Sequence, residues 1–301
     1  IVFGDWSSDV CSSDLKAEPG KEPRYLLLFG DASYDYKNRT QNNTNIIPSF
    51  QSVASLSPIS SFVSDDYFGM LDDNEGQAAN GKLDIGIGRF PVFTTEQAAQ
   101  AVNKVLYYSS GDERVKNDWR NVVTFVADDQ NEGGNLFVED SEDLSKIIEK
   151  DYPHYNVDKI YSDAYNMIST PGGARYPEVN EAINKRMEKG TLLMNYVGHG
   201  GELGWGHERI LEVPDIISYA NKDRLPVFVT ATCEFSRFDD PERISAGEWV
   251  FLNPVGGGVA LFTTTRLTFA GTNKSLLVNF YQQVFRQQAG RYMKMGDLLV
   301  A

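Results

Sequence analysis

Two strongly apolar segments of this 301-residue chain each end in a residue that can take part in catalysis. Residues 191–197 run directly into Gly198-His199-Gly200-Gly201, and residues 226–232 run into Cys233. An unbroken apolar or β-branched run of this length is typical of a central parallel strand that helices cover on both faces. Ligands of open α/β sheets bind at the carboxyl ends of such strands. The pattern therefore predicts that His199 and Cys233 lie side by side at one edge of a sheet, joined by a βαβ connection.

Segments typical of strands and of helices alternate along the rest of the chain. Strands are expected at 24–30, 83–91, 122–127, 156–161 and 256–264, and helices at 95–110, 137–150, 178–189, 213–220, 245–251 and 273–288. Such alternation indicates an α/β fold with a mainly parallel sheet flanked by helices on both faces. The Asn-, Ser- and Pro-rich stretch 37–60 has little periodicity, and long loops of this kind are usually functional.

The first residues differ in character from the rest of the chain. Residues 1–15 have neither the basic nor the apolar region of a signal peptide, and they read like a translated adaptor. We therefore expect a non-native or unstructured leader over 1–15, with the native export signal upstream of this sequence. One α/β domain is expected over 16–301, and its N-terminal part, 24–110, is a candidate subdomain.

The charge and the cysteine count exclude several classes of protein. The net charge of −14 and the isoelectric point near 4.7 disfavour nucleic acid and anionic lipid as partners, because both would be repelled. No run of 18 apolar residues is present that could span a membrane. Two cysteines, Cys11 and Cys233, cannot build a disulfide framework.

A cysteine at the end of a strand has two interpretations. A thiol attacks a carbonyl carbon as the thiolate, so a catalytic cysteine needs a partner for its proton, and at neutral pH this partner is usually a histidine. A lone cysteine after an apolar strand is also commonly a buried core residue. Cys233 follows the apolar run instead of lying within it, and His199 follows a second run, which favours the catalytic interpretation.

The glycines around His199 also have two interpretations. Without side chains at 198, 200 and 201 a peptide substrate could approach the main chain, and the N–H of Gly200 could face a developing oxyanion. A plain tight turn after the strand is the alternative. Two further histidines are weaker candidates, since His207 is expected in a loop over the site and His154 in a turn.

Acidic residues are candidates for an orienting or a substrate-binding role. Asp128 and Asp129 follow the strand at 122–127, and they could orient His199 or meet a basic side chain of the substrate. We select Asp129, together with Glu234, as the candidate for either role. In a chain this acidic, a solvated carboxylate is the simpler interpretation.

A second acidic group could bind a metal. Asp72, Asp73 and Glu75 offer the oxygen ligands that calcium prefers, but their spacing departs from the EF-hand loop. Calcium is therefore a weak candidate, and no cofactor is required by the chemistry at Cys233.

Several longer motifs resemble the gingipain family of cysteine peptidases. They are NYVGHGG at 195–201, VTATCEF at 229–235 and LDIGIGRF at 83–90. DDYFG at 65–69, TATCEFSRFDDP at 230–241 and SAGE at 245–248 resemble, more narrowly, the sortase-like signal peptidases of the type IX secretion system. Together these motifs extend the resemblance over about residues 24–300.

The resemblance implies a caspase-like, Rossmann-like fold and a set of catalytic roles. Cys233 would be the nucleophile, His199 its general base or imidazolium partner, and the N–H groups of Gly200 and Cys233 the oxyanion hole. The acidic residue that the family places near the histidine has no secure match here, and Asp129 is the candidate by position. The resemblance also implies that residue 301 precedes the last strand of the family's domain.

The narrower resemblance implies an exported enzyme at the outer membrane or cell surface of a Gram-negative bacterium. It would remove the C-terminal signal domain of secreted cargo through a thioester. Its partners would be that cargo, outer-membrane secretion components and a lipopolysaccharide amine as acyl acceptor. Two alternatives stay open, a degradative protease that cleaves many proteins after Arg or Lys, and a non-catalytic scaffold of the secretion machinery with an inert, buried Cys233.

Overall fold

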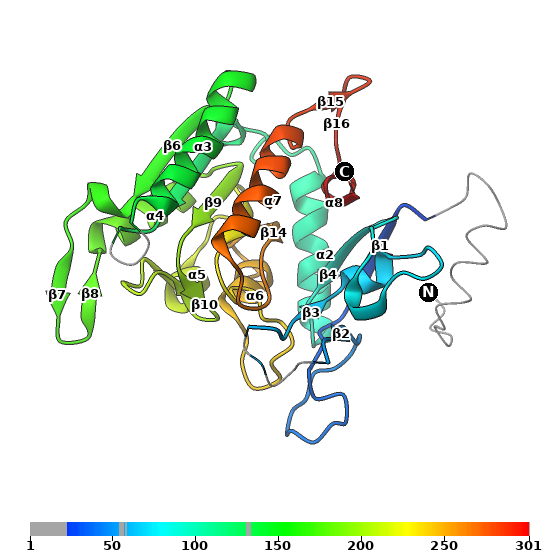
Figure 1. The fold of residues 1–301 in the computed structure, drawn as a ribbon. Helices are drawn as coiled ribbons and strands as arrows, with labels where there is room; N and C mark the ends of the chain where they lie inside the picture. Colours follow the sequence, from blue (N-terminus) through cyan, green and yellow to red (C-terminus); the bar gives the residue numbers. More distant parts are fainter. Residues whose placement is uncertain (1–22, 54–56, 58, 131–133, 301) are drawn as a thin grey trace.

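A five-stranded parallel sheet forms the centre of the molecule (Figure 1). The computed structural model describes residues 23–53, 57, 59–130 and 134–300. The sheet has the strand order β14-β13-β9-β5-β6. Its strands are β5 (Val122–Ala127), β6 (Asn156–Tyr161), β9 (Leu193–Val197), β13 (Val227–Ala231) and β14 (Ala260–Phe262). The predicted mainly parallel sheet is confirmed.

Helices cover both faces of this sheet. Side chains alternate between the faces, so Phe125 and Val229 point to one side and Met194 and Phe228 to the other. The first side packs against α3 (Leu136–Asp151) and α7 (Ala270–Gln283), and the second against α4 (Pro177–Lys189), α5 (Val213–Ser218) and α6 (Ala246–Leu252). Both cores are fully buried, which explains why the strand sequences are apolar without alternation.

Three neighbouring strands end in register at the carboxyl edge. Val197 pairs with Ala231 of β13 on one side and with Ala127 of β5 on the other. One step further along, the N–H of Asp128 donates to the carbonyl of Val197 at 3.0 Å, and the N–H of Gly198 donates to that of Ala231 at 3.4 Å. The segments that follow β5, β9 and β13 therefore leave the sheet side by side.

The N-terminal part forms a separate parallel pair of strands, β1 (Tyr25–Phe29) and β4 (Gly86–Phe90). Strands were expected at both places, but they pair with each other and are not hydrogen-bonded to the central sheet. Helix α2 (Thr95–Ser109) joins this part to the rest, because its Lys104 Nζ donates to the carbonyls of Phe251 at 2.6 Å and Gly256 at 3.0 Å. The subdomain boundary at 110 stays a prediction.

Short elements complete the described chain. Antiparallel β10 (Gly200–Gly201), β11 (Gly204–Trp205) and β12 (Leu211–Glu212) follow β9, and the hairpin of β7 (Ile168–Thr170) and β8 (Gly173–Arg175) extends from one side (Figure 1). The others are β2 (Phe50–Gln51), β3 (Val63–Ser64), β15 (Gln287–Gln288), β16 (Arg291–Tyr292) and α8 (Met295–Val300), with 3₁₀ turns η1 (Asp66–Gly69), η2 (Gln77–Ala79), η3 (Asp118–Asn121) and η4 (Ser162–Ala164).

Most expected helices match within two residues, whereas the strand expected over 256–264 is the shorter β14 and the last long helix is displaced. The last long helix, expected over 273–288, is α7, which begins at Ala270 and ends at Gln283, before β15 turns the chain. The helix expected over 95–110 is α2, whose N-cap is Thr94, because Thr94 Oγ1 accepts the N–H of Gln97 at 3.1 Å. Among the described residues, no helix combines the length and apolarity needed to cross a membrane. The leader expected over 1–15 lies outside the described residues.

Candidate active site

The main chain of His199 is fixed by hydrogen bonds at the end of β9. Its N–H donates to Asp128 Oδ2 at 2.8 Å, and its carbonyl accepts from the Tyr196 hydroxyl at 2.6 Å and from the N–H of Gly206 at 2.9 Å. The preceding residue must be glycine, because a Cβ at 198 would overlap the Asp128 side chain and the Tyr196 hydroxyl. The sequence 198–199 therefore holds the histidine close to β5.

The imidazole of His199 contacts two other rings. Phe137 of α3 meets it edge-on, with centroids 5.1 Å apart and an interplanar angle of 85°. The ring of His207 stacks nearly parallel to that of His199, with centroids also 5.1 Å apart and an interplanar angle of 15°. These contacts restrict rotation of the His199 ring, and they place His207, a weaker candidate in the sequence, directly at the site.

Cys233 lies in a sharp turn just after β13. It is a free, half-buried thiol, and its Sγ is 3.9 Å from the carbonyl oxygen of Thr268. The next residue, Glu234, has φ of 53°, which is unusual for a residue with a side chain, and its N–H donates to the carbonyl of Arg266 at 3.2 Å. The turn takes the cysteine out of the strand, as the catalytic interpretation requires. Cys11 lies outside the described residues.

The segments that carry His199 and Cys233 are in contact. Both residues stand two positions beyond the paired residues Val197 and Ala231 of adjacent strands, which lie about 4.8 Å apart in a sheet. A Cβ at Gly200 would overlap Thr232 Oγ1, so the glycine loop packs against the residue before the cysteine. The predicted adjacency of the two strand ends is confirmed, and the catalytic roles of His199, Cys233 and the N–H of Gly200 stay predictions.

An ion-pair cluster that no local sequence pattern indicated ties the two segments together. Glu202, three residues after His199, has a side chain only 11% exposed. Its Oε1 lies 2.5 Å from Arg237 Nη1, and its Oε2 lies 2.8 Å from Arg243 Nη1. Burial lowers the pKa of Arg237, but the hydrogen bond and the charge of Glu202 outweigh burial and raise it. Glu202 thus joins the loop after β9 to the loop after β13.

Glu234, the candidate acid after Cys233, approaches the same cluster. One of its carboxylate oxygens is 3.9 Å from Arg237 Nη1. At that distance it contributes to the charge balance of the cluster, and its orienting or substrate-binding role stays a prediction.

Three carboxylates gather at the end of β5. Oxygen atoms of Asp128, Asp129 and Glu208 lie within 4.8 Å of one another. Burial raises the pKa of Asp128, although the hydrogen bonds that it accepts from backbone N–H groups lower it in part. The pKa of Glu208 is also raised, first by burial and then by the negative charges of Asp129 and Asp128. A basic side chain or a cation entering here would relieve the repulsion among these groups.

The structure separates the roles of the two aspartates. Asp128 holds the main chain of His199, whereas Asp129 Oδ2 accepts the hydroxyl of Tyr176 at 2.9 Å. The sequence offers both residues, and Asp129 is the one predicted to orient His199 or bind the substrate. Its role beside His199 stays a prediction, and Asp128 is the one whose contact with the histidine backbone is established.

The carboxylates that converge at the candidate calcium site differ by one residue from those predicted. The carboxylates that converge within 4.8 Å are Asp72, Glu75 and Asp84, so Asp84 takes the place expected for Asp73 in this group. Asp84 Oδ2 also accepts the N–H of Leu71 at 2.7 Å, and Glu75 Oε1 accepts that of Lys82 at 3.2 Å. Three carboxylates offer suitable oxygens for calcium.

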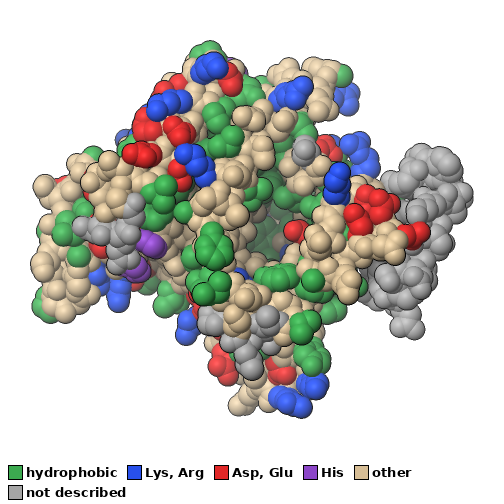
Figure 2. Space-filling model, in the orientation of Figure 1, with side chains coloured by type: hydrophobic (Ala, Val, Ile, Leu, Met, Phe, Trp, Pro, Cys, Tyr) green, Lys and Arg blue, Asp and Glu red, His purple; other side chains and the backbone are tan. Residues whose placement is uncertain are grey.

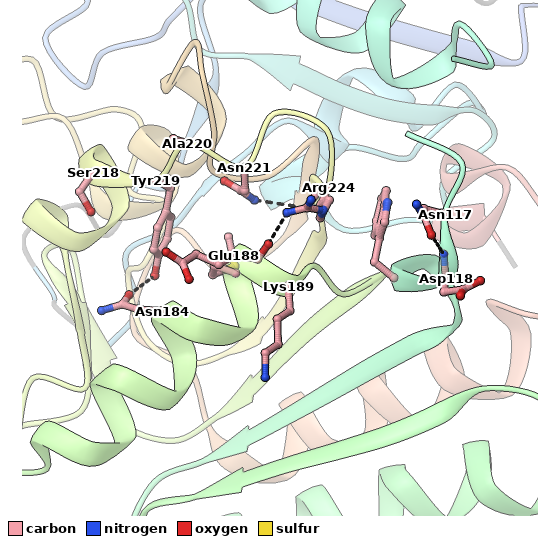
Figure 3. Close-up of a pocket in the computed structure, with 12 residues that line it drawn as sticks. Asn117, Asp118, Asn184, Glu188, Lys189, Ser218, Tyr219, Ala220, Asn221 and Arg224 are labelled. Carbon is pink, nitrogen blue, oxygen red and sulfur yellow. Dashed lines mark hydrogen bonds between the residues drawn. The ribbon is translucent and has the colours of Figure 1, made fainter. Parts of the chain in front are cut away.

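A polar groove of about 880 Å³ lies at the opposite, amino-terminal end of the strands (Figure 3). Much of its polar lining is engaged within the protein: the Tyr219 hydroxyl donates to Asn184 Oδ1 at 2.8 Å, and Arg224 Nη1 to the carbonyl of Glu188 at 2.6 Å. It contains neither His199 nor Cys233, so its chemistry is separate from theirs. Its lining residues are Asn117, Asp118, Trp119, Asn184, Met187, Glu188, Lys189, Ser218, Tyr219, Ala220, Asn221 and Arg224.

Comparison with known families decides which group of proteins shares this arrangement. The family described as peptidase family C25 matches residues 11–301. The chain belongs to peptidase family C25. This is a family of cysteine peptidases, in agreement with the resemblance to gingipains carried by the sequence motifs.

Solved structures show that the C25 chain has the caspase-like fold of gingipains. It is similar to the Arg-specific cysteine proteinase gingipain R (RgpB), with a TM-score of 0.72, 16% identity, and coverage of 97% of this chain and 60% of that one. The complex of the Porphyromonas gingivalis RgpB pro- and mature domains gives a TM-score of 0.68, 16% identity and coverage of 93% and 58%. A structure described only as a protease gives a TM-score of 0.64 and 16% identity, with coverage of 90% of this chain and 52% of that one.

The extent of these matches limits what they establish. This C25 chain spans about 60% or less of the length of the solved chains that it matches, and at 16% identity the likeness establishes the fold. No curated protein matches the sequence. Family and fold are therefore established, and the activity, substrates and partners of this protein are matters of proposal.

Proposed function

We propose that this protein is a cysteine endopeptidase in which Cys233 is the nucleophile and His199 its acid–base partner. The observation that carries the proposal is the equal offset of the two residues beyond the paired ends of adjacent parallel strands. The half-buried thiol and the ring contacts that orient His199 support it further. A core cysteine would need none of these features.

The proposed reaction begins with transfer of the Cys233 proton to His199. The thiolate attacks the carbonyl carbon of the scissile peptide, and the N–H groups of Gly200 and Cys233 bind the oxyanion. When the C–N bond breaks, the imidazolium returns its proton to the leaving amine, and a thioester remains on Cys233. Attack by water, or by an amine, then releases the acyl group and restores the thiol.

The finer proposal is a sortase-like signal peptidase resembling PorU of the type IX secretion system. It would remove the C-terminal signal domain of exported cargo at the outer membrane or cell surface, beside outer-membrane secretion components, and could transfer the acyl group to a lipopolysaccharide amine. Support comes from the motifs at 65–69, 230–241 and 245–248, which resemble those of this type of enzyme.

The test is Cys233→Ala in the complete protein, with a cargo that carries its C-terminal signal domain. We expect loss of signal-domain removal, with normal removal in the matched control Glu181→Gln, which changes only a surface ion pair with Lys185. Removal at the normal rate by Cys233→Ala would eliminate the assignment of the nucleophile.

A second candidate function is a degradative protease that cleaves after basic residues. The cluster of Asp128, Asp129 and Glu208 favours it, because three carboxylates beside His199 would attract an Arg or Lys side chain. A peptide-library profile separates the two functions: cleavage of many unrelated peptides after Arg or Lys supports the degradative enzyme, and restriction to cargo supports the signal peptidase.

A non-catalytic scaffold is the alternative from a different class. An inert thiol would resist iodoacetamide until the protein unfolds, whereas an active-site thiol reacts in the folded protein. Labelling of Cys233 in the native state, read by mass spectrometry, distinguishes these cases.

We also propose a structural calcium ion at Asp72, Glu75 and Asp84. If it binds there, calcium should raise the Tm of the wild-type protein relative to EDTA, and Asp84→Asn should reduce that increase. An identical response in the variant and the wild type would argue against this position.

A further inference from the structure

The loop between β14 and α7 touches the candidate nucleophile. This loop covers residues 263–269, and the carbonyl oxygen of Thr268 is 3.9 Å from Cys233 Sγ. Leu267 and Phe269 therefore flank the residue that contacts the sulfur. Both residues are therefore one position away from the main-chain contact with the sulfur, in the region that a peptide bound at Cys233 would approach.

The main chain of this loop is held firmly. The carbonyl of Thr264 accepts the N–H of Ser236 at 3.0 Å, and Thr265 Oγ1 donates to the carbonyl of Val63 at 3.0 Å. The guanidinium of Arg266 binds both carboxylate oxygens of the fully buried Asp239, at 2.7 and 2.6 Å. The shape of the loop is thus fixed before any substrate arrives.

The two large apolar side chains of this anchored loop are nevertheless exposed. Leu267 is 41% exposed and Phe269 is 68% exposed. In Figure 2, hydrophobic side chains gather near the lower end of α7, beside a hollow in the surface. A fixed apolar surface next to a nucleophile gains free energy when an apolar group of the substrate covers it.

The position in the sheet separates this surface from the acidic cluster. Strand β13, which leads to Cys233, has β14 on one side and β9 followed by β5 on the other. Leu267 and Phe269 follow β14, whereas His199 follows β9 and the two aspartates of the acidic cluster follow β5. The charged neighbour Arg266 is engaged by Asp239, so the loop after β14 offers a substrate mainly apolar contact.

We infer that Leu267 and Phe269 form an apolar subsite that selects peptides with an apolar or aromatic side chain within two residues of the scissile bond. This inference rests on the proposed function, since it takes Cys233 as the nucleophile. It adds a substrate class, because the acidic cluster alone would select only for basic groups.

The test uses peptidyl chloromethyl ketones, which alkylate an active-site thiol without requiring turnover. Reagents with Phe, Leu, Ser, Asp or Lys at each of the two positions nearest the reactive carbon are compared by the rate at which Cys233 is alkylated in the complete protein. Chloromethyl ketones report only on the acyl side of the scissile bond. A peptide library that varies the residues on both sides of the bond therefore tests the preference on the leaving-group side. We expect Phe or Leu to exceed Ser and Asp by about 10- to 100-fold at one position.

Variants connect that preference to the subsite. Phe269→Ser and Leu267→Ser should reduce the apolar preference to about twofold or less, while the rate with the small reagent chloroacetamide stays within about twofold of the wild type. Leu106→Ser, at a 63% exposed position on α2, is the matched control and should keep the full preference.

Each outcome bears on a different claim. If the wild type shows no apolar preference on either side, or if Phe269→Ser and Leu267→Ser keep it, the subsite is refuted. If Cys233 reacts with neither the peptide reagents nor chloroacetamide in the folded protein, the proposed function itself fails.

Discussion

Replacing Glu202 with glutamine removes the charge that joins the His199 loop to the Cys233 loop. Glu202 is paired with Arg237 at 2.5 Å and with Arg243 at 2.8 Å. Glutamine has nearly the same shape and can keep one hydrogen bond, so Glu202→Gln tests the charge with little change in packing. We expect the two loops to separate slightly and the activity to fall further than the stability would suggest.

The structure sets the size of both effects. The Arg243 side chain is 53% exposed, so losing its pair costs at most about 1 kcal/mol. The Arg237 side chain is 27% exposed, so its ion pair with Glu202 is intermediate between an exposed pair and a buried pair. Breaking a fully buried pair costs about 3–5 kcal/mol. We therefore expect a loss of about 2–3 kcal/mol in the free energy of unfolding. A shift of about 1 Å between reacting groups lowers kcat about 100-fold.

Two measurements separate positioning from stability. Urea unfolding gives the free energy of unfolding, and kcat and KM are determined for the same preparation at a temperature where the variant is fully folded. The control is Glu181→Gln, which breaks an exposed pair and should change neither. If Glu202→Gln loses stability but keeps the wild-type kcat, or changes only KM, Glu202 does not position the catalytic groups.

Two further substitutions test the packing beside His199 and the electrostatics of Asp31, a buried carboxylate in the segment after β1. Gly198→Ala should lower the free energy of unfolding by about 1–3 kcal/mol, because the added methyl group meets Asp128 and Tyr196; wild-type stability in urea would show that this close approach is wrong. Burial raises the pKa of Asp31 to about 6, so the folded state binds more protons than the unfolded state between pH 4 and 6, and this carboxyl lowers stability as pH rises through that range. Asp31→Asn should gain about 2.4 kcal/mol over the wild type between pH 4 and pH 7 in urea unfolding, and an unchanged difference at the two pH values would contradict the shift.

The sequence predicted the central sheet because its strands carry a strong local signal. The runs at 122–127, 191–197 and 226–232 are largely apolar on both faces, as expected for strands that helices cover on both sides, and their ends are marked by Asp128, Gly198 and Cys233. The site followed from the same rule, since parallel strands bring their carboxyl ends to one edge.

Other features depend on contacts between segments distant in sequence. The pairing of Glu202 with Arg237 joins residues 35 positions apart, and nothing in either local sequence distinguishes it from a solvated charge. Asp84 joins Asp72 and Glu75 only because the chain turns back on itself. Strands β10, β11 and β12 have two residues each, too few for any periodicity to register.

The most direct test of the central claim is the rate at which iodoacetamide alkylates Cys233 near pH 6, compared between the wild type and His199→Ala. We expect rapid alkylation of the folded wild type and a rate at least about 10-fold lower in His199→Ala, because the thiol then has no imidazole to take its proton. His154→Ala, which changes a histidine in a turn after α3, should react like the wild type. Equal rates in the wild type and His199→Ala would contradict the pairing of these two residues.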